Sequence, residues 1–482
     1  MGLHIGDIII EGNDIFGDGV NIAARLEGIA EPGGICFSRA AYEQVYGKLD
    51  VVFEDGGEKR LKNIAQPVRI YHVKFGVTTP SSKLASPDKP SIAVLPFTNM
   101  SGDPDQEYFS DGITEDIITD LSKVAGLLVI SRNSSFAYKE KSIDVRTVGR
   151  ELAVRSILEG SIRRVGNRVR ITAQLIDAAN GAHLWADRYD RDLTDIFAVQ
   201  DEVTGHIVDA LKIKLTSVEA ARIADIPTKS PEAHDLFLRG RELILGRKWT
   251  RDVFDKLVAF MTRAIELDPA YAEAYAGLAF AHNQDFHNRL TGSPDALDVA
   301  ERFATIGIEK GPMVPFVHWV AAAVVLWKKD FERVKRETEI ALALNPNYAL
   351  ACAARGNAET YSGHPLAAIP FYERAMRLDP AFTQQYIHFL GSAYLVAGQY
   401  EAAAASFRER IRLAPETDLS RGLLISALGH LGQIDEARRV WAELKQVNPK
   451  YSFAGHLCRL PFSNSADADR IKDGFAKVGL SE

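Results

Sequence analysis

Cysteine is scarce in this sequence, and apolar runs are short. The three cysteines among the 482 residues, Cys36, Cys352 and Cys458, are too scattered for a disulfide framework or a zinc site, so we expect buried, reduced thiols. The apolar run from Val320 to Trp327 is far too short to span a bilayer. The N-terminus lacks the basic-then-apolar pattern of a signal peptide. These absences predict a cytoplasmic protein without a transmembrane segment.

An excess of positive charge is also absent. The net charge is −7 and the pI is near 6.0, which argues against a general nucleic-acid binder. Hydrophobic residues make up 46% and charged residues 25% of the chain, the proportions of a globular protein. The chain is long enough for three domains of ordinary size. The patterns described below predict a multidomain fold with α/β and all-α parts.

Prolines recur in the C-terminal half at a nearly constant interval. The intervals are 34, 34, 35 and 34 residues, between Pro312, Pro346, Pro380, Pro415 and Pro449. A period of this length is typical of tetratricopeptide repeats, and small and aromatic residues recur in phase with it, such as Gly356 with Tyr372 and Gly391 with Phe407. We therefore predict a right-handed solenoid over residues 231–480, with about six repeats of which the first two are irregular.

Repeat arrays of this kind present a concave surface to a protein or peptide partner. Polar residues on the helices expected to line that surface are candidate contacts: Arg355, Asn357, Gln384, Gln385, His388 and Arg421. A solvated surface is the simpler interpretation for most of them. The partner itself cannot be read from the sequence.

The middle of the chain alternates between strand and helix patterns. Residues 77–90 are rich in Pro and Ser and lack apolar periodicity, which predicts a linker. A strand pattern from Ser91 to Phe97, a helix pattern from Asp111 to Leu121 and a hairpin around Gly166 follow. This order predicts a mixed α/β domain over residues 91–214.

Residues 91–214 resemble the TolB-N-terminal-like domain of bacterial regulators. The segments that carry the resemblance include Leu95-Pro96-Phe97, Tyr108 to Asp116, and Leu184 to Asp190. The family gives this domain no defined role. A cluster of polar residues at the start of its first helix, Ser110, Asp111, Glu115 and Asp116, offers a ligand or metal site. Helix caps and dipole partners are the favoured interpretation of such a cluster.

The first thirty residues combine an apolar strand pattern with a glycine-rich turn and a helix. The strand is expected from Leu3 to Ile10 and the helix from Gly19 to Gly28. Asn21 and Arg25 are four residues apart, so they share one helix face near its N-terminus. Backbone N–H groups and the helix dipole favour a phosphate group there.

The segment from Gly12 to Glu27 closely resembles the substrate-binding segment of class III adenylate cyclases, and Gly57 to Val73 matches the end of the same domain. The resemblance implies that residues 1–76 are the C-terminal half of a ferredoxin-like cyclase domain with ATP as substrate. It also implies that Asp14 selects adenine, Asn21 orients the ribose and Arg25 stabilises the α-phosphate transition state. Family members build each site between two protomers, so a homodimer or a complementing cyclase protomer is the implied partner.

The resemblance also implies two ions of Mg²⁺ or Mn²⁺, held by two Asp residues of the other half of the domain. Those residues and the adenine-reading Lys are missing from this sequence. Asp7 and Glu11 share one strand face, but a solvent-exposed position is the favoured interpretation. We therefore expect no metal site and no activity from this chain alone. Two functions remain open: a cyclase regulated through its repeats, or a non-enzymatic scaffold that carries a cyclase remnant.

Overall fold

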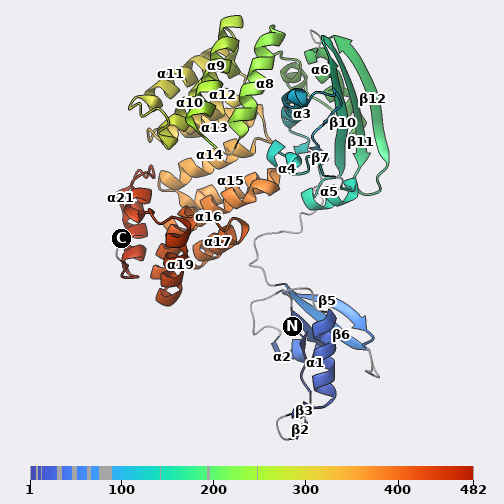
Figure 1. Ribbon diagram of the computed structural model, residues 1–482, viewed down its shortest axis with the longest axis vertical. Helices are drawn as coiled ribbons and strands as arrows, with labels where there is room; N and C mark the ends of the chain where they lie inside the picture. The colour runs from blue at the N-terminus through green and yellow to red at the C-terminus, as the bar shows by residue number, and fades with distance from the viewer. Residues whose placement is uncertain are drawn as a thin grey trace. The chain divides into compact units, whose positions relative to one another are not determined.

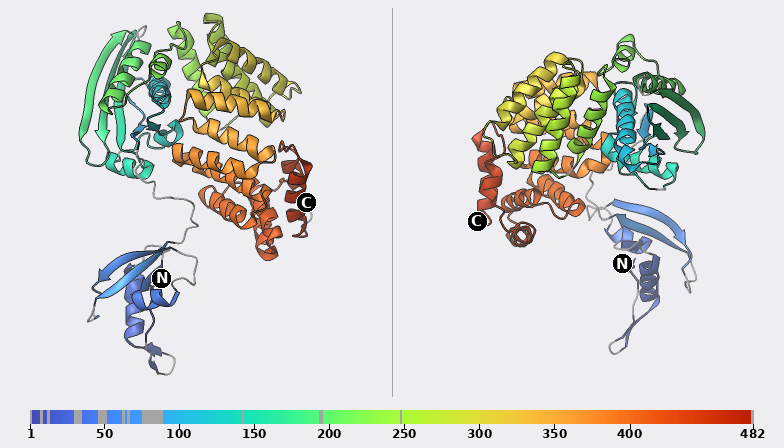
Figure 2. Two further views of the ribbon diagram at one scale, coloured as in Figure 1. Left: turned by 180° about the vertical axis from the view of Figure 1, so that it is seen from behind. Right: turned by 45° about the horizontal axis from the view of Figure 1, so that its top comes forward.

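The computed structural model describes residues 2–6, 9–11, 14–29, 35–45, 52–61, 64, 67–74, 89–141, 143–192, 196–246 and 248–480 (Figures 1 and 2). The chain divides into two compact units, residues 1–82 and 83–482. The predicted linker 77–90 lies outside the described residues apart from Lys89 and Pro90. No helix in the described part of the chain is long and apolar enough to cross a membrane.

The first unit contains a four-stranded sheet in the order β1 (Gly2–Leu3), β4 (Ile35–Ser38), β6 (Val68–Lys74), β5 (Val52–Lys59). β1 runs parallel to β4, and the other two pairs are antiparallel. Helix α1 (Asp18–Ile29) packs on β1 and β4, and α2 (Arg39–Val45) packs on β4 and β6. A separate hairpin joins β2 (Ile9–Glu11) to β3 (Asp14–Phe16).

The single strand predicted from Leu3 to Ile10 is wrong, because the structure places β1 and β2 in different sheets. The chain leaves the strand conformation at residues 4–6. There the His4 ring contacts the Ser38 hydroxyl, with 2.8 Å between Nδ1 and Oγ. Gly6 has a low strand propensity and offers no side chain to extend the pairing. The predicted helix is confirmed, and it starts one residue earlier and ends one residue later.

A small core joins α1 to the sheet of the first unit. Leu26 is fully buried against Cys36, Leu61 and Ile70. Gly2 lies so close to the α1 backbone at Ala23 that any Cβ there would collide with it. The close approach of β1 to α1 therefore requires glycine at this position.

The second unit begins with a mixed sheet, whose strand order is β12 (His183–Asp192), β11 (Arg168–Asp177), β10 (Ser156–Val165), β7 (Ser91–Val94) and β9 (Leu128–Val129). The short strand β8 (Thr98–Asn99) lies outside this order and pairs with β10. The β10–β7 and β7–β9 pairs are parallel, whereas β10–β11 and β11–β12 are antiparallel. This confirms the predicted mixed α/β sheet. β12 was not predicted, because its charged residues obscure the period-two pattern of a half-buried strand.

Helices cover both faces of this sheet. Ile92 and Val94 point to the face that packs on α3 (Glu107–Ser122) and α6 (Ile196–Ala210), and Ala93 points to the face that packs on α5 (Val145–Leu152). The opposite directions follow from the two-residue period of a strand. Two short helices, α4 (Arg132–Phe136) and α7 (Ser217–Ile223), complete this α/β part.

The rest of the second unit is helical, and its helices pack in consecutive pairs (Figure 1). The pairs are α8 (Pro231–Leu245) with α9 (Arg251–Leu267), α10 (Ala272–Asn288) with α11 (Ala296–Lys310), α12 (Pro315–Leu326) with α13 (Phe331–Leu344), α14 (Ala349–Tyr361) with α15 (Pro365–Leu378), α16 (Thr383–Val396) with α17 (Tyr400–Leu413), and α18 (Leu419–His430) with α19 (Ile434–Val447). Each pair also packs on the next. Helices α20 (Phe453–Leu457) and α21 (Ser465–Ala476) follow.

The residues that recur with the 34-residue period pack against each other between the two helices of a pair. A Cβ built on Gly356 would lie 2.5 Å from the Tyr372 ring, and a Cβ on Gly391 would lie 2.8 Å from the Phe407 ring. Both aromatic side chains are fully buried. The glycine of one helix therefore makes room for the aromatic ring of its partner, which confirms the packing role predicted for these in-phase residues.

Two of the three cysteines are buried as predicted, Cys36 and Cys352. The prediction is wrong for Cys458, which is exposed. It follows the short helix α20, and its thiol donates to the Gly455 carbonyl at 3.3 Å.

Candidate functional site

The predicted nucleotide-binding residues lie around the start of α1. Gly17, with a φ of 136°, turns the chain into the helix, and its carbonyl accepts a hydrogen bond from the Asn21 backbone at 3.2 Å. Asn21 and Arg25 are both exposed, one turn apart on the same helix face. Arg25 forms no ion pair with any described residue. The structure thus leaves both side chains free to meet a ligand, and their roles stay predictions.

Asp14 lies in β3 and pairs with Glu11 across the hairpin. The side chains of both residues lie outside the described part of the structure, as does Asp7. Within the described residues, no group of three or more His, Cys, Asp or Glu side chains could hold a metal ion. The two metal ions that the cyclase resemblance implies therefore stay a prediction, and we derive no step through a metal.

The acidic cluster at the start of α3 forms ion pairs with other elements. Asp111 pairs with Lys139 at 2.7 Å, and Glu115 pairs with Arg132 at 3.0 Å. Asp116 pairs with Arg241 of α8 at 2.8 Å. The capping role favoured from the sequence is wrong for these three residues, because α3 begins at Glu107 with Gln106 as its N-cap, and the three acidic residues therefore lie inside the helix.

Arg241 is the centre of a buried polar network between α3 and α8. Besides Asp116, it contacts Glu115 at 3.3 Å and donates to the Gly112 carbonyl at 2.8 Å. Asp116 also accepts a hydrogen bond from Gln200 at 2.8 Å. Burial alone would raise the pKa of Asp116, but Arg241 and His234 hold it well below its ordinary value. This network joins the α/β part to the first helix pair.

Two repeat-connecting turns also contact the α/β part. The Asn347 side chain donates to the carbonyls of Ser122 and Leu127 at 3.1 and 3.0 Å. The Asp379 carboxylate accepts from the Ser134 hydroxyl at 2.6 Å. These contacts join the α/β part to the repeats within the second unit, residues 83–482, and the predicted domain boundary between the two parts stays a prediction.

Helices that we expected to line an open groove are partly covered by the end of the chain. α21 packs on α16 and α18. The Ser426 hydroxyl of α18 donates to the Ile471 carbonyl at 2.7 Å, and the His430 ring contacts the Arg470 carbonyl at 2.8 Å. Helix α21 of the same chain therefore covers part of the surface that α16 and α18 form.

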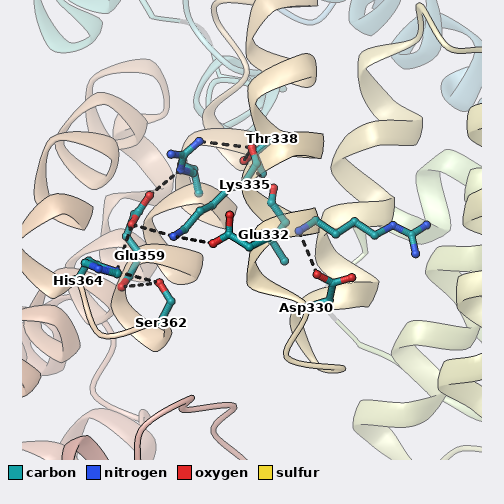
Figure 3. A network of polar contacts seen from close by, with 10 residues as sticks. Asp330, Glu332, Lys335, Thr338, Glu359, Ser362 and His364 are labelled. Carbon is teal, nitrogen blue, oxygen red and sulfur yellow. Dashed lines mark hydrogen bonds and ion pairs between the residues drawn. The ribbon is translucent and has the colours of Figure 1, made fainter.

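Five of the six candidate groove residues are hydrogen-bonded within the array. Their partners are Glu359 for Arg355, Tyr372 for Asn357, Arg410 for Gln384, Ser420 for His388 and the Thr417 carbonyl for Arg421. Gln385 is partly buried. Figure 3 shows the ionic network around Glu359, in which Lys335 lies between Glu332 and Glu359 at 3.4 and 3.7 Å. These polar residues thus have structural partners of their own.

Glu273, in the first turn of α10, leaves one of its carboxylate oxygens without such a partner. Its Oε2 atom is buried without a hydrogen bond to any described residue. Burial raises its pKa to about 7; a hydrogen bond from its own backbone N–H and the charge of Lys123 oppose the increase, and Asp116 and Asp225 add to it. Sequence analysis missed both Glu273 and Arg241, because an isolated charge in an amphipathic helix gives no local sign of what it will contact.

We expect Glu273→Gln to stabilise the protein at pH 8 but not at pH 4. A folded-state pKa of about 7 lies above the ordinary pKa of 4.5 for a glutamate side chain, so protonation favours the folded state as the pH falls from 7 to 4.5. One pKa unit corresponds to about 1.4 kcal/mol, so the charged carboxylate costs about 3 kcal/mol above pH 7. Urea unfolding at both pH values measures the difference. An equal effect at both would contradict the assignment of the pKa.

Several known proteins are similar to parts of this chain. Residues 88–205 match the family described as "HilA/YgeH-like transcriptional regulator, second domain". This description does not name a TolB domain, so the TolB resemblance of residues 91–214 stays a prediction. Two solved structures are similar to parts of this chain. An adenylate/guanylate cyclase/hydrolase from Silicibacter pomeroyi is 46% identical over 15% of this chain and 43% of that chain, with a TM-score of 0.15. The tetratricopeptide protein YrrB is 18% identical over 42% of this chain and 98% of that chain, with a TM-score of 0.31. At these TM-scores neither likeness establishes a shared fold or function.

A protein of Rhizobium meliloti (strain 1021) named "Putative adenylate cyclase 3" is 48% identical over 343 residues. The match covers 70% of this chain and 58% of that relative. The chain is thus related to a protein named as an adenylate cyclase, and it spans 58% of that relative's length.

Proposed function

We propose that residues 1–76 supply the nucleotide-contacting half of a class III adenylate cyclase site, and that the helical repeats serve protein interaction. The observation that carries the proposal is the placement of Asn21 and Arg25, exposed one turn apart on the same face of α1. The 48% identity to a protein named as an adenylate cyclase supports it.

Each residue has a distinct role in the proposed site. The Asp14 carboxylate would accept a hydrogen bond from the adenine amino group. Asn21, in the first turns of α1, would hold the ribose. Arg25 is always protonated, and its planar group would stabilise the negative charge on the α-phosphoryl group as the 3′-hydroxyl attacks and pyrophosphate leaves. The dipole of α1 favours the same negative charge.

The proposed site also needs Mg²⁺ or Mn²⁺, and the described residues do not offer the ligands. We propose that a complementing cyclase protomer supplies them. A non-enzymatic scaffold is the second candidate function, and the six consecutive helix pairs favour it because such arrays commonly bind proteins.

Mixing experiments test the proposed function. The purified chain is expected to form no cyclic AMP from ATP with Mg²⁺ or Mn²⁺. Addition of an intact homologous cyclase variant that keeps its metal-binding Asp residues, but lacks the Asn and Arg, is expected to restore cyclic AMP formation. That variant alone is the control. Turnover by the isolated chain would overturn the requirement for a partner, and no product in the mixture would favour the scaffold.

A further inference from the structure

A cavity of about 270 Å³ lies inside the second unit, between the α/β part and the repeats. Its walls come from α3 and α6 on one side and from α8, α10, α12 and α14 on the other. Ile226 and Met313 line it and are each 52% exposed, which places them where the cavity meets solvent. Its volume is at the small end of the range for ligand sites.

One wall of the cavity is a continuous row of aromatic rings. The centroids of Tyr271 and Phe237 are 5.4 Å apart, and those of Phe237 and Phe316 are 6.2 Å apart. Trp319 follows Phe316 at 5.8 Å, and Tyr348 follows Trp319 at 5.9 Å. All five side chains line the cavity. Ring faces carry partial negative charge and attract cations.

The charged side chains around the cavity leave negative charge uncompensated. Seven acidic and four basic side chains line it among the described residues. Three of the basic ones, Lys123, Arg132 and Arg241, are paired with carboxylates, and Arg222 donates to the Ala343 carbonyl at 3.1 Å. Among the described residues, the buried Oε2 atom of Glu273 has no hydrogen-bond partner, and neither has the buried Nε atom of Arg222. A buried polar atom without a partner requires an explanation, and a ligand supplies one.

We propose that this cavity binds a small organic cation, a protonated primary amine with an apolar or aromatic body, whose ammonium group pairs with Glu273 and whose body lies against the aromatic row. An ammonium group satisfies the orphan oxygen with a charge-assisted hydrogen bond. An anion would face the same carboxylate and the negative ring faces. This site is independent of the nucleotide site proposed for the first unit.

Calorimetric titration of the full chain at pH 8 with 2-phenylethylammonium tests the proposal. We expect saturable binding, and no binding of 3-phenylpropionate, which has a similar body and the opposite charge. Glu273→Gln is expected to weaken amine binding about tenfold or more, because it removes a hydrogen bond to a charged group. Glu309→Gln, at an exposed position of α11, is the matched control and is expected to bind as the wild type does.

Thermal unfolding of each variant shows whether it is folded, so a loss of binding cannot come from unfolding. Three results of the small-molecule titrations would overturn the proposal. They are absence of saturable amine binding, equal binding by Glu273→Gln, and equal binding of the carboxylate analogue. Equally tight binding of a lysine-containing peptide would assign the cavity to a protein side chain, and would also overturn it.

Discussion

Replacement of Arg241 by alanine is expected to lower the free energy of unfolding of the second unit by about 3–5 kcal/mol. The side chain is largely buried and holds two carboxylates of α3, those of Asp116 and Glu115, at 2.8 and 3.3 Å. Its removal would leave Asp116 buried without its guanidinium partner, and Glu115 with Arg132 as its remaining cation. Because Arg241 belongs to α8 and the carboxylates to α3, the loss also weakens the contact between the α/β part and the repeats.

Denaturant unfolding followed by circular dichroism measures this change. Arg251→Ala is the matched control, because Arg251 is exposed and pairs with Asp255 four residues later on the surface of α9. Such a pair contributes about 0.3–0.5 kcal/mol, so the control is expected to unfold nearly as the wild type does. Similar midpoints for the two variants would show that the buried network does not hold these helices together.

The repeats could be predicted from the sequence because their packing is local and periodic. Gly356 meets Tyr372, and Gly391 meets Phe407, within one helix pair, so each contact appears as a fixed spacing along the chain. The sheet was predicted for a similar reason. Val169, Ile171, Ala173 and Leu175 alternate along β11, and all four are buried at 2% exposure or less.

Contacts between distant segments could not be predicted in this way. Arg241 and Asp116 are 125 residues apart, and Asn347 is 225 residues from Ser122. No spacing or motif marks such a pair, since each residue has an ordinary local pattern. The same reason explains why the cover of α18 by α21 was missed. Asn21 and Arg25 could be proposed from the sequence, because a single helix presents both of them.

The effect of Arg25 on cyclic AMP formation tests the central claim that α1 contributes to a nucleotide site. In the mixture with the complementing cyclase variant, Arg25→Ala is expected to lower the rate by about 10²–10³-fold, the usual loss when one stabiliser of transition-state charge is removed. Arg39→Ala is the matched control, since Arg39 is exposed in α2 of the same unit and pairs with Glu43 at 2.7 Å. The account predicts a large loss for Arg25→Ala and none for Arg39→Ala. Equal rates for Arg25→Ala and the wild type would contradict it.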